Sequence, residues 1–214
     1  MAKKPKFKGK VVIDDPENVK INDIKPNIKR SISFQEGSWF YNQMLVKLSN
    51  LTKDFIKGIN EDLAPPGEKM TTEAELTINA HYMENVVHDL RDSFDSKVVM
   101  GTPGSIFREI YYEIDFSVEG KTGFCVVVRL EEIETGVDKD FINNLGEKKF
   151  EDKWKDKASI AAIYMCDFFP EQMSRDFGNN WKEIFLTKAD DLRNKLAKEF
   201  SIGKKYIRLS ISKY

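Results

Sequence analysis

Cysteine and histidine are the scarcest chemistry-bearing residues of this sequence, with two copies of each in 214 residues. Cys125 and Cys166 both fall inside apolar stretches that we expect to be strands, which favours buried, reduced thiols over a disulfide framework. The G-x-S-x-G nucleophile motif and phosphate-binding glycine loops are missing too, and Gly101–Gly104 is predicted to be a plain turn. The sequence therefore predicts no cofactor and favours a protein that is not an enzyme.

Long hydrophobic runs and a large net charge are also absent. No apolar run approaches the roughly 18–20 residues that cross a bilayer. The basic N-terminus is followed by polar residues where a secretory signal would be apolar. The formal net charge is −1, so no global field attracts nucleic acid or a membrane surface. We expect a protein of the cytoplasm or another intracellular compartment, without membrane contact.

What is present is the composition of a folded domain with a basic extension. The chain is 41% hydrophobic and 12% aromatic, which is typical of a globular protein. Residues 1–32 lack hydrophobic periodicity and hold nine Lys or Arg against four Asp or Glu. We therefore expect an extended basic arm over residues 1–32 and a single α+β domain over residues 33–214. A long helix within residues 33–66 could form a separate packing element of that domain.

The clearest structural signal is strict alternation over residues 106–131. Even positions from 106 to 118 are apolar or aromatic except for Arg108, while the odd positions include the acids Glu109, Glu113 and Asp115. After a short turn the alternation resumes through residue 131. This pattern predicts an antiparallel hairpin with one buried face. One plausible register places Glu113 opposite Arg129 as a cross-strand ion pair.

Helical periodicity and capping patterns predict the remaining elements. S/T-x-x-E boxes at Ser33 and Thr72 predict two helices before the hairpin, the second with an apolar stripe running to Phe94. The other predicted elements are a strand at 97–101, a short helix from 137, a strand at 159–169, a helix from 180 to about 203 and a strand at 205–212. The predicted fold class is α+β: an N-terminal extended arm and two helices, then a mixed sheet in the order β-β-β-α-β-α-β with helices packed on it. Each β-α-β step favours a parallel crossover.

His81, Glu84 and His88 are weak candidates for a metal site. On the helix predicted here they would share one face within about 60°, and imidazole and carboxylate groups are zinc ligands. That face points away from the apolar stripe of the predicted helix, and the spacing is not H-E-x-x-H. A solvent-exposed helix face is therefore the alternative interpretation.

The acids of the hairpin suggest a different kind of site. The predicted order helix-β-β-β-α-β over residues 72–169 is similar to the core of PD-(D/E)xK nucleases, in which carboxylates on neighbouring strands hold Mg²⁺. The resemblance implies Glu84, Asp115 and Glu131 as catalytic residues. The stretch 127–129 reads Val-Val-Arg where that family has acid-x-Lys, so the implied core is degenerate. An outward sheet face stabilised by ion pairs is the alternative interpretation.

Two lysine-rich stretches could contact phosphates or acidic surfaces. Residues 147–157 mix five lysines with four acids and two aromatics, which indicates a solvent-exposed helix. Residues 3–10 hold five lysines and no acid, which makes them the best electrostatic candidate of the chain. Trp39 lies off the apolar stripe of the first predicted helix, so a second apolar patch there could face a partner.

The leading hypothesis is a non-enzymatic structural, assembly or protein-interaction subunit of a larger complex, such as a virion or a similar particle. It would dock through its basic arm on other subunits or on a second copy of itself. The predicted partner-binding residues are Lys3, Lys4, Lys6, Phe7, Lys8, Lys10 and Trp39. The alternative is a nucleic-acid-binding or nucleic-acid-processing protein with a degenerate nuclease-like core.

Overall fold

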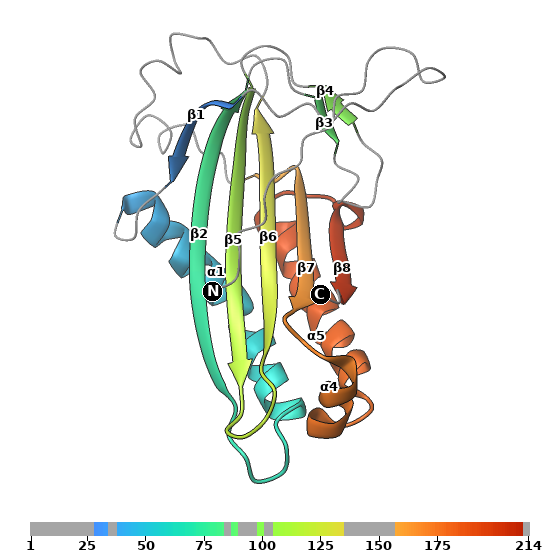
Figure 1. Ribbon diagram of the computed structural model, residues 1–214. Helices are drawn as coiled ribbons and strands as arrows, with labels where there is room; N and C mark the ends of the chain where they lie inside the picture. The colour runs from blue at the N-terminus through green and yellow to red at the C-terminus, as the bar shows by residue number, and fades with distance from the viewer. Residues whose placement is uncertain are drawn as a thin grey trace.

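A six-stranded mixed sheet with helices on one side is the main feature of the computed structural model (Figure 1). The model describes residues 28–33, 38–83, 87–89, 98–100, 105–134 and 157–211. The sheet order is β1 (Ile28–Ser33), β2 (Thr71–Met83), β5 (Ser105–Ser117), β6 (Phe124–Glu134), β7 (Ile160–Cys166) and β8 (Ile207–Ile211). Neighbouring strands are antiparallel except β7 and β8, which are parallel. β3 (Val87–Asp89) and β4 (Val98–Met100) form a separate antiparallel pair.

The described helices are α1 (Trp39–Asp62), α4 (Pro170–Phe177) and α5 (Trp181–Glu199), with a short 3-10 turn η2 (Lys204–Tyr206) before β8. α1 and α5 lie behind the sheet in Figure 1 and contact each other as well as the strands. None of the described helices combines the length and the apolar character needed to cross a membrane.

The alternation of β5 divides the sheet into two chemically different faces. Its even residues Ile110, Tyr112, Ile114 and Phe116 are buried in one core cluster with α1 and α5. We call this side the back face and the side towards the viewer of Figure 1 the front face. The front face carries the odd residues of β2, β5 and β6, because successive side chains of a strand point to opposite sides. The α+β class and the mixed sheet predicted from the sequence are confirmed.

Arg108 is the one charged residue in the apolar series of β5, and the structure accounts for it. Its side chain is 2% exposed, and its register partner on β6 is Glu132. The Arg108 guanidinium donates to the Glu132 carboxylate at 2.5 Å. A buried charge is tolerated when it is paired in this way.

α1 is an amphipathic helix whose buried stripe joins the main core. Its N-cap is Ser38, whose hydroxyl accepts from the Tyr41 backbone N–H at 3.3 Å. The capping box predicted at Ser33 is therefore wrong, because Ser33 is the last residue of β1. The stripe consists of Phe40, Met44, Leu48, Phe55 and Ile59, all buried in the same core cluster as the sheet. α1 thus packs into the same core as the sheet.

α5 closes the core against α1 and the sheet. Its predicted apolar stripe of Trp181, Phe185, Ala189, Leu192 and Leu196 is buried throughout. Phe185 meets Phe55 of α1 edge-to-face, with ring centroids 6.3 Å apart, and Phe55 meets Phe116 of β5 in the same way at 6.4 Å. This aromatic series connects the two helices to the middle of the sheet.

Three predicted features differ from the structure. The segment predicted as a second helix from Thr72 begins with the long strand β2, and β3 lies further along it. β6 and β7 are antiparallel, whereas a parallel crossover was expected there. Residues 28–32, assigned to the arm, belong to β1, which pairs with β2. The helix predicted from 137 and residues 1–27 lie outside the described residues.

Replacing Phe185 by Ala should lower the free energy of unfolding by about 3–5 kcal/mol, because it leaves a cavity between α1, α5 and the sheet. Phe169→Ala is the matched control, since Phe169 is 61% exposed and should cost less than about 0.5 kcal/mol. Urea denaturation measures both changes. Equal losses in the two variants would contradict the assignment of the core.

Candidate functional site on the front face of the sheet

The front face carries polar and reactive side chains from β2, β5, β6 and β7. The registers of β2, β5, β6 and β7 align these side chains in rows that run across the sheet. Three of these rows are Glu73–Asp115–Cys125–Cys166, then Glu75–Glu113–Val127–Tyr164, then Asn79–Glu109–Glu131–Ile160. Residues in a row are close enough for their side chains to touch.

A compact charged network occupies the part of the front face around Arg129. Its guanidinium contacts Glu131 directly and Glu109 at 3.6 Å. His81 lies 3.5 Å from the other oxygen of Glu109, and the Tyr111 hydroxyl donates to Glu109 at 3.0 Å. Both carboxylates are buried, and Arg129 also stacks over the Tyr111 ring. Each acid of the network thus has a positive or hydrogen-bonding partner.

The pKa values in this network follow from those contacts. Burial acts to raise the pKa of Glu109, but hydrogen bonds from His81 and Tyr111 and the charge of Arg129 outweigh it, so the pKa is lowered. Burial raises the pKa of Tyr111, so its hydroxyl keeps its proton near neutral pH and remains a donor. Burial acts to lower the pKa of Arg129, but Glu131, Tyr111 and Glu109 raise it overall. The network therefore holds fixed charges and has no acid or base poised near pH 7 among these three residues.

Further along the same face, four carboxylates stand together without an ion pair to a described cation. Glu73 is the register partner of Asp115, and Glu75 that of Glu113, so two pairs of like charges stand opposite each other on adjacent strands. All four side chains are exposed. No described Lys, Arg or His makes an ion pair with any of them. Burial, Glu75, Asp115 and Asp167 together raise the pKa of Glu113. We call these four residues the carboxylate block.

Beside the carboxylate block, in the same two rows but on β6 and β7, lies a small apolar cluster. It consists of Cys125, Val127 and Cys166, with Tyr111 and Tyr164 packed against it. The two cysteines are direct register partners on β6 and β7, and both are buried and reduced. The prediction that they are buried residues within strands is confirmed.

The structure does not bring together Asp115 and Glu131, two of the catalytic residues of the nuclease-like hypothesis. Asp115 and Glu131 both face the front, but Asp115 is opposite Cys125, whereas Glu131 is opposite Glu109. Cys125, the partner of Asp115, is six residues from Glu131 along β6, so Asp115 and Glu131 are about 20 Å apart along the strand direction. Glu84 lies outside the described residues. The predicted Glu113–Arg129 pair is wrong as well, since Glu113 faces Val127 and Arg129 faces Tyr111.

The candidate metal ligands are also separated in the fold. His81 is on β2 and His88 is on β3 of the second sheet, so the helical spacing that grouped them does not exist. His81 instead stacks on Phe107 and pairs with Glu109. Within the described ranges, no three His, Cys, Asp or Glu residues are arranged to hold a metal ion.

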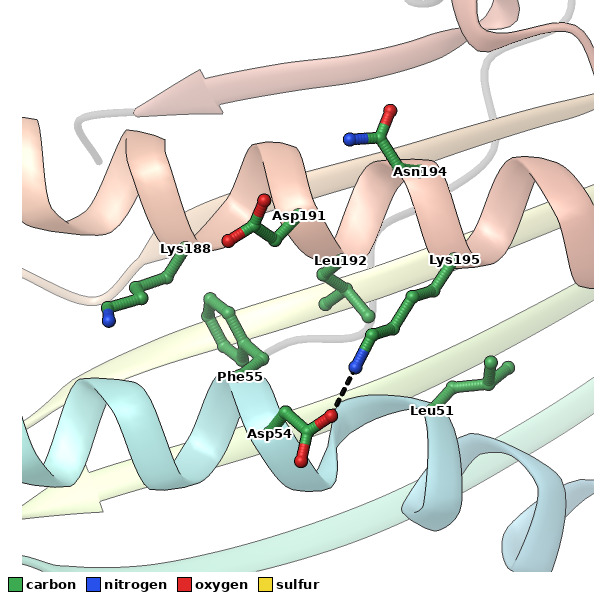
Figure 2. Close-up of a pocket in the computed structure, with 8 residues that line it drawn as sticks. All are labelled: Leu51, Asp54, Phe55, Lys188, Asp191, Leu192, Asn194 and Lys195. Carbon is green, nitrogen blue, oxygen red and sulfur yellow. Dashed lines mark hydrogen bonds and ion pairs between the residues drawn. The ribbon is translucent and has the colours of Figure 1, made fainter.

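A groove of about 490 Å³ runs between α1 and α5 on the other side of the molecule (Figure 2). Leu51, Phe55 and Leu192 supply its apolar lining. An ion pair between Asp54 and Lys195 bridges the two helices across it. The hydrogen bond and charge of Lys195 lower the pKa of Asp54. Lys188, Asp191 and Asn194 complete its polar lining, and the Asp54–Lys195 ion pair links the two helices.

Two groups of front-face residues were missed from the sequence. Glu73 and Glu75 were assigned to a helix, although Ala74, Leu76 and Ile78 alternate with polar residues from Thr71 to Ala80, which is the signal for a half-buried strand. The network of Glu109, His81 and Glu131 joins β2 to the β5–β6 hairpin, and no local sequence pattern predicts contacts between segments so far apart in the chain. Of the predicted partner-binding residues, Trp39 is 56% exposed on α1, and the others lie outside the described residues.

No protein-family model matches the chain, and neither a curated protein nor a solved structure is significantly similar to it.

Replacing Arg129 by Met should destabilise the protein by about 2–3 kcal/mol near neutral pH, because Glu109 and Glu131 would remain buried without their cation. The loss is smaller than for a fully buried pair because the Arg129 side chain is 26% exposed. Since the folded state lowers the pKa of Glu109, its stabilising effect is present above the unfolded pKa of about 4.3 and disappears as pH falls through the lower folded pKa. Urea titrations at pH 7 and pH 3 should therefore show a smaller difference between variant and wild type at pH 3.

Proposed function

We propose that this protein is a non-enzymatic assembly subunit whose basic N-terminal arm docks on the carboxylate block of a neighbouring copy. The carboxylate block is the main support for this proposal, because its paired carboxylates repel each other and lower the stability of the isolated subunit. Like charges directly opposite each other on adjacent strands are unfavourable. Natural proteins keep such local conflicts mainly where a function needs them.

The arm has the charge that the carboxylate block lacks. Residues 3–10 contain five lysines and no acid, and the block presents four exposed carboxylates on two adjacent strands. Four charges spread over two rows suit an extended chain of separated lysines better than a compact ion. The nearby rings of Tyr111 and Tyr164 offer an apolar contact for Phe7.

α1 presents a second surface that supports an assembly role. Trp39 and Val46 are 56% and 60% exposed. They are seven residues apart, and therefore lie along one line of the helix. That line is on the side opposite the buried stripe of Phe40, Met44 and Leu48. Large apolar side chains exposed together on a helix are typical of a contact surface.

A charge-swap experiment tests the docking directly. In one full-length variant Lys3, Lys4, Lys6, Lys8 and Lys10 are changed to Glu. In a second variant Glu73, Glu75, Glu113 and Asp115 are changed to Lys. Each variant alone should be monomeric by light scattering after size exclusion, because its arm and block repel. An equimolar mixture should associate, because each arm then meets a block of opposite charge.

The same measurement separates the alternatives. If neither the wild type nor the mixture associates, docking between copies is refuted. A chain beginning at Ile28 keeps β1 and should lose self-association without unfolding. Adding a short DNA duplex at low and moderate salt probes the nucleic-acid alternative. Steeply salt-dependent binding to DNA that is lost with the five lysines would favour that function.

Glu113→Gln should raise stability and weaken self-association at the same time. Removing one charge of the block relieves repulsion and should increase the free energy of unfolding at pH 7 by about 0.5 kcal/mol. The folded state raises the pKa of Glu113, so its unfavourable effect is absent at low pH and grows as pH rises past its unfolded pKa of about 4.3. The gain should therefore vanish at pH 3–4. Glu183→Gln, on the exposed side of α5, is the control with the same loss of charge. A stability loss at pH 7 in Glu113→Gln would contradict the proposal.

A further inference from the structure

Cys125 and Cys166 are aligned side by side, near the beginning of β6 and at the end of β7. They are direct register partners on the antiparallel strands β6 and β7, and both belong to the front-face apolar cluster. The Cys166 thiol is close enough to raise the pKa of Cys125. Their exposed fractions are 4% and 5%, and both thiols are reduced. The arm docking proposed above makes no use of either thiol.

The register of this pair gives a Cα separation that a disulfide accepts. Directly opposite residues of an antiparallel pair have Cα atoms about 4.5 or 5.5 Å apart, depending on their hydrogen-bonding pattern. A disulfide accepts Cα separations of about 4.4–6.8 Å. Both register positions fall within that range, and the side chains already point to the same face. The Cα separation of this pair is therefore compatible with a disulfide between the two strands.

We propose that Cys125 and Cys166 form a dithiol modification site, which a small hydroperoxide oxidises to a disulfide between β6 and β7. Burial selects the oxidant. A bulky disulfide such as oxidised glutathione must bring its own sulfur into line with a thiolate, and side chains that are 4–5% exposed leave little room for this. Hydrogen peroxide is small enough to reach the pair.

The reaction proceeds in two steps. The Cys166 thiolate attacks one peroxide oxygen, the O–O bond breaks, and the leaving hydroxide takes up a proton to become water, which leaves a sulfenic acid on Cys166. The sulfur of Cys125 then attacks the Cys166 sulfur, the S–O bond breaks, and the departing hydroxide takes the Cys125 thiol proton as a second water. Two thiols are oxidised by two electrons, and one peroxide is reduced to two waters.

The position of Asp115 assigns the second role to Cys125, because Asp115 is the direct register partner of Cys125 on β5. The neighbouring Cys166 thiol, burial and the carboxylate of Asp115 all raise the pKa of Cys125. A thiolate is the nucleophile in the first step, so Cys125 is poorly suited to that step. It is suited to resolving a sulfenic acid on Cys166, its register partner on β7.

The disulfide would fasten the beginning of β6 to the end of β7. Cys166 is followed by Asp167, which has a positive φ of 54°, and the chain then enters α4. The bond also closes the long loop between the two cysteines. Closing a loop of this kind stabilises a protein mainly by restricting its unfolded chain.

The experiment treats the reduced full-length protein with hydrogen peroxide, alkylates remaining thiols under denaturing conditions and measures the intact mass. The expected product is about 2 Da lighter than the reduced protein, takes up no alkyl group and returns to the dithiol with dithiothreitol. Its Tm should be higher than that of the reduced protein by roughly 5–15 °C. Cys125→Ser and Cys166→Ser are the matched controls, and neither should lose about 2 Da or gain in Tm on peroxide treatment.

Three results would overturn the proposal. In the first, both thiols of the wild type are still alkylated after peroxide treatment. In the second, peroxide adds about 16 or 32 Da to Cys125 or Cys166 of the wild type, located by peptide mass analysis, as sulfenic or sulfinic acid without disulfide formation. In the third, the disulfide joins two chains, which a non-reducing gel shows as a dimer that either serine variant still forms.

Discussion

The register of β5 between β2 and β6 is the constraint on which the rest of the structure depends. It places Tyr112 between Leu76 and Val128 on the back face, where α1 and α5 supply the rest of the core. The Tyr112 hydroxyl lies 3.1 Å from that of Ser49 on α1. A shift by one residue would turn the apolar side chains of β5 to the front and the acids towards the helices. The core and the front-face rows are thus consequences of one pairing.

That pairing produces two different electrostatic environments on one face. Around Arg129 the acids are buried and each has a partner, so this network stabilises the sheet and offers little to a ligand. In the carboxylate block the acids are exposed and stand opposite one another. Since both sets lie on the same strands, strand formation alone does not explain the difference. The distribution of cations does: Arg129 sits two rows away from Asp115 and contacts Glu109 and Glu131 instead.

The sequence predicts those parts of the fold in which the hydrophobic pattern fits either a strand or a helix, but not both. The alternation of residues 106–131 and the stripe of α5 are unambiguous, and both are confirmed. In residues 72–83, Leu76, Ala80 and Met83 fit a helix, whereas Ala74, Leu76, Ile78 and Ala80 fit a strand equally well. Pairing along the whole of β5 decides between them. The predicted hairpin register differed by two residues, because the turn is centred on Gly120, whose φ of 72° favours glycine.

The candidate site could be predicted only in part, because its rows join strands whose registers no local pattern encodes. Asp115 was a candidate from its own strand, but its neighbours Glu73 and Cys125 became visible only once β2 and β6 were aligned with β5. This row also couples the two proposals physically. The negative charge of Asp115 disfavours the Cys125 thiolate, and lysines docked on the carboxylate block would offset that charge. Docking of the arm would therefore make the thiol pair easier to ionise, while its bulk would restrict the access of peroxide, so the two effects on oxidation oppose each other.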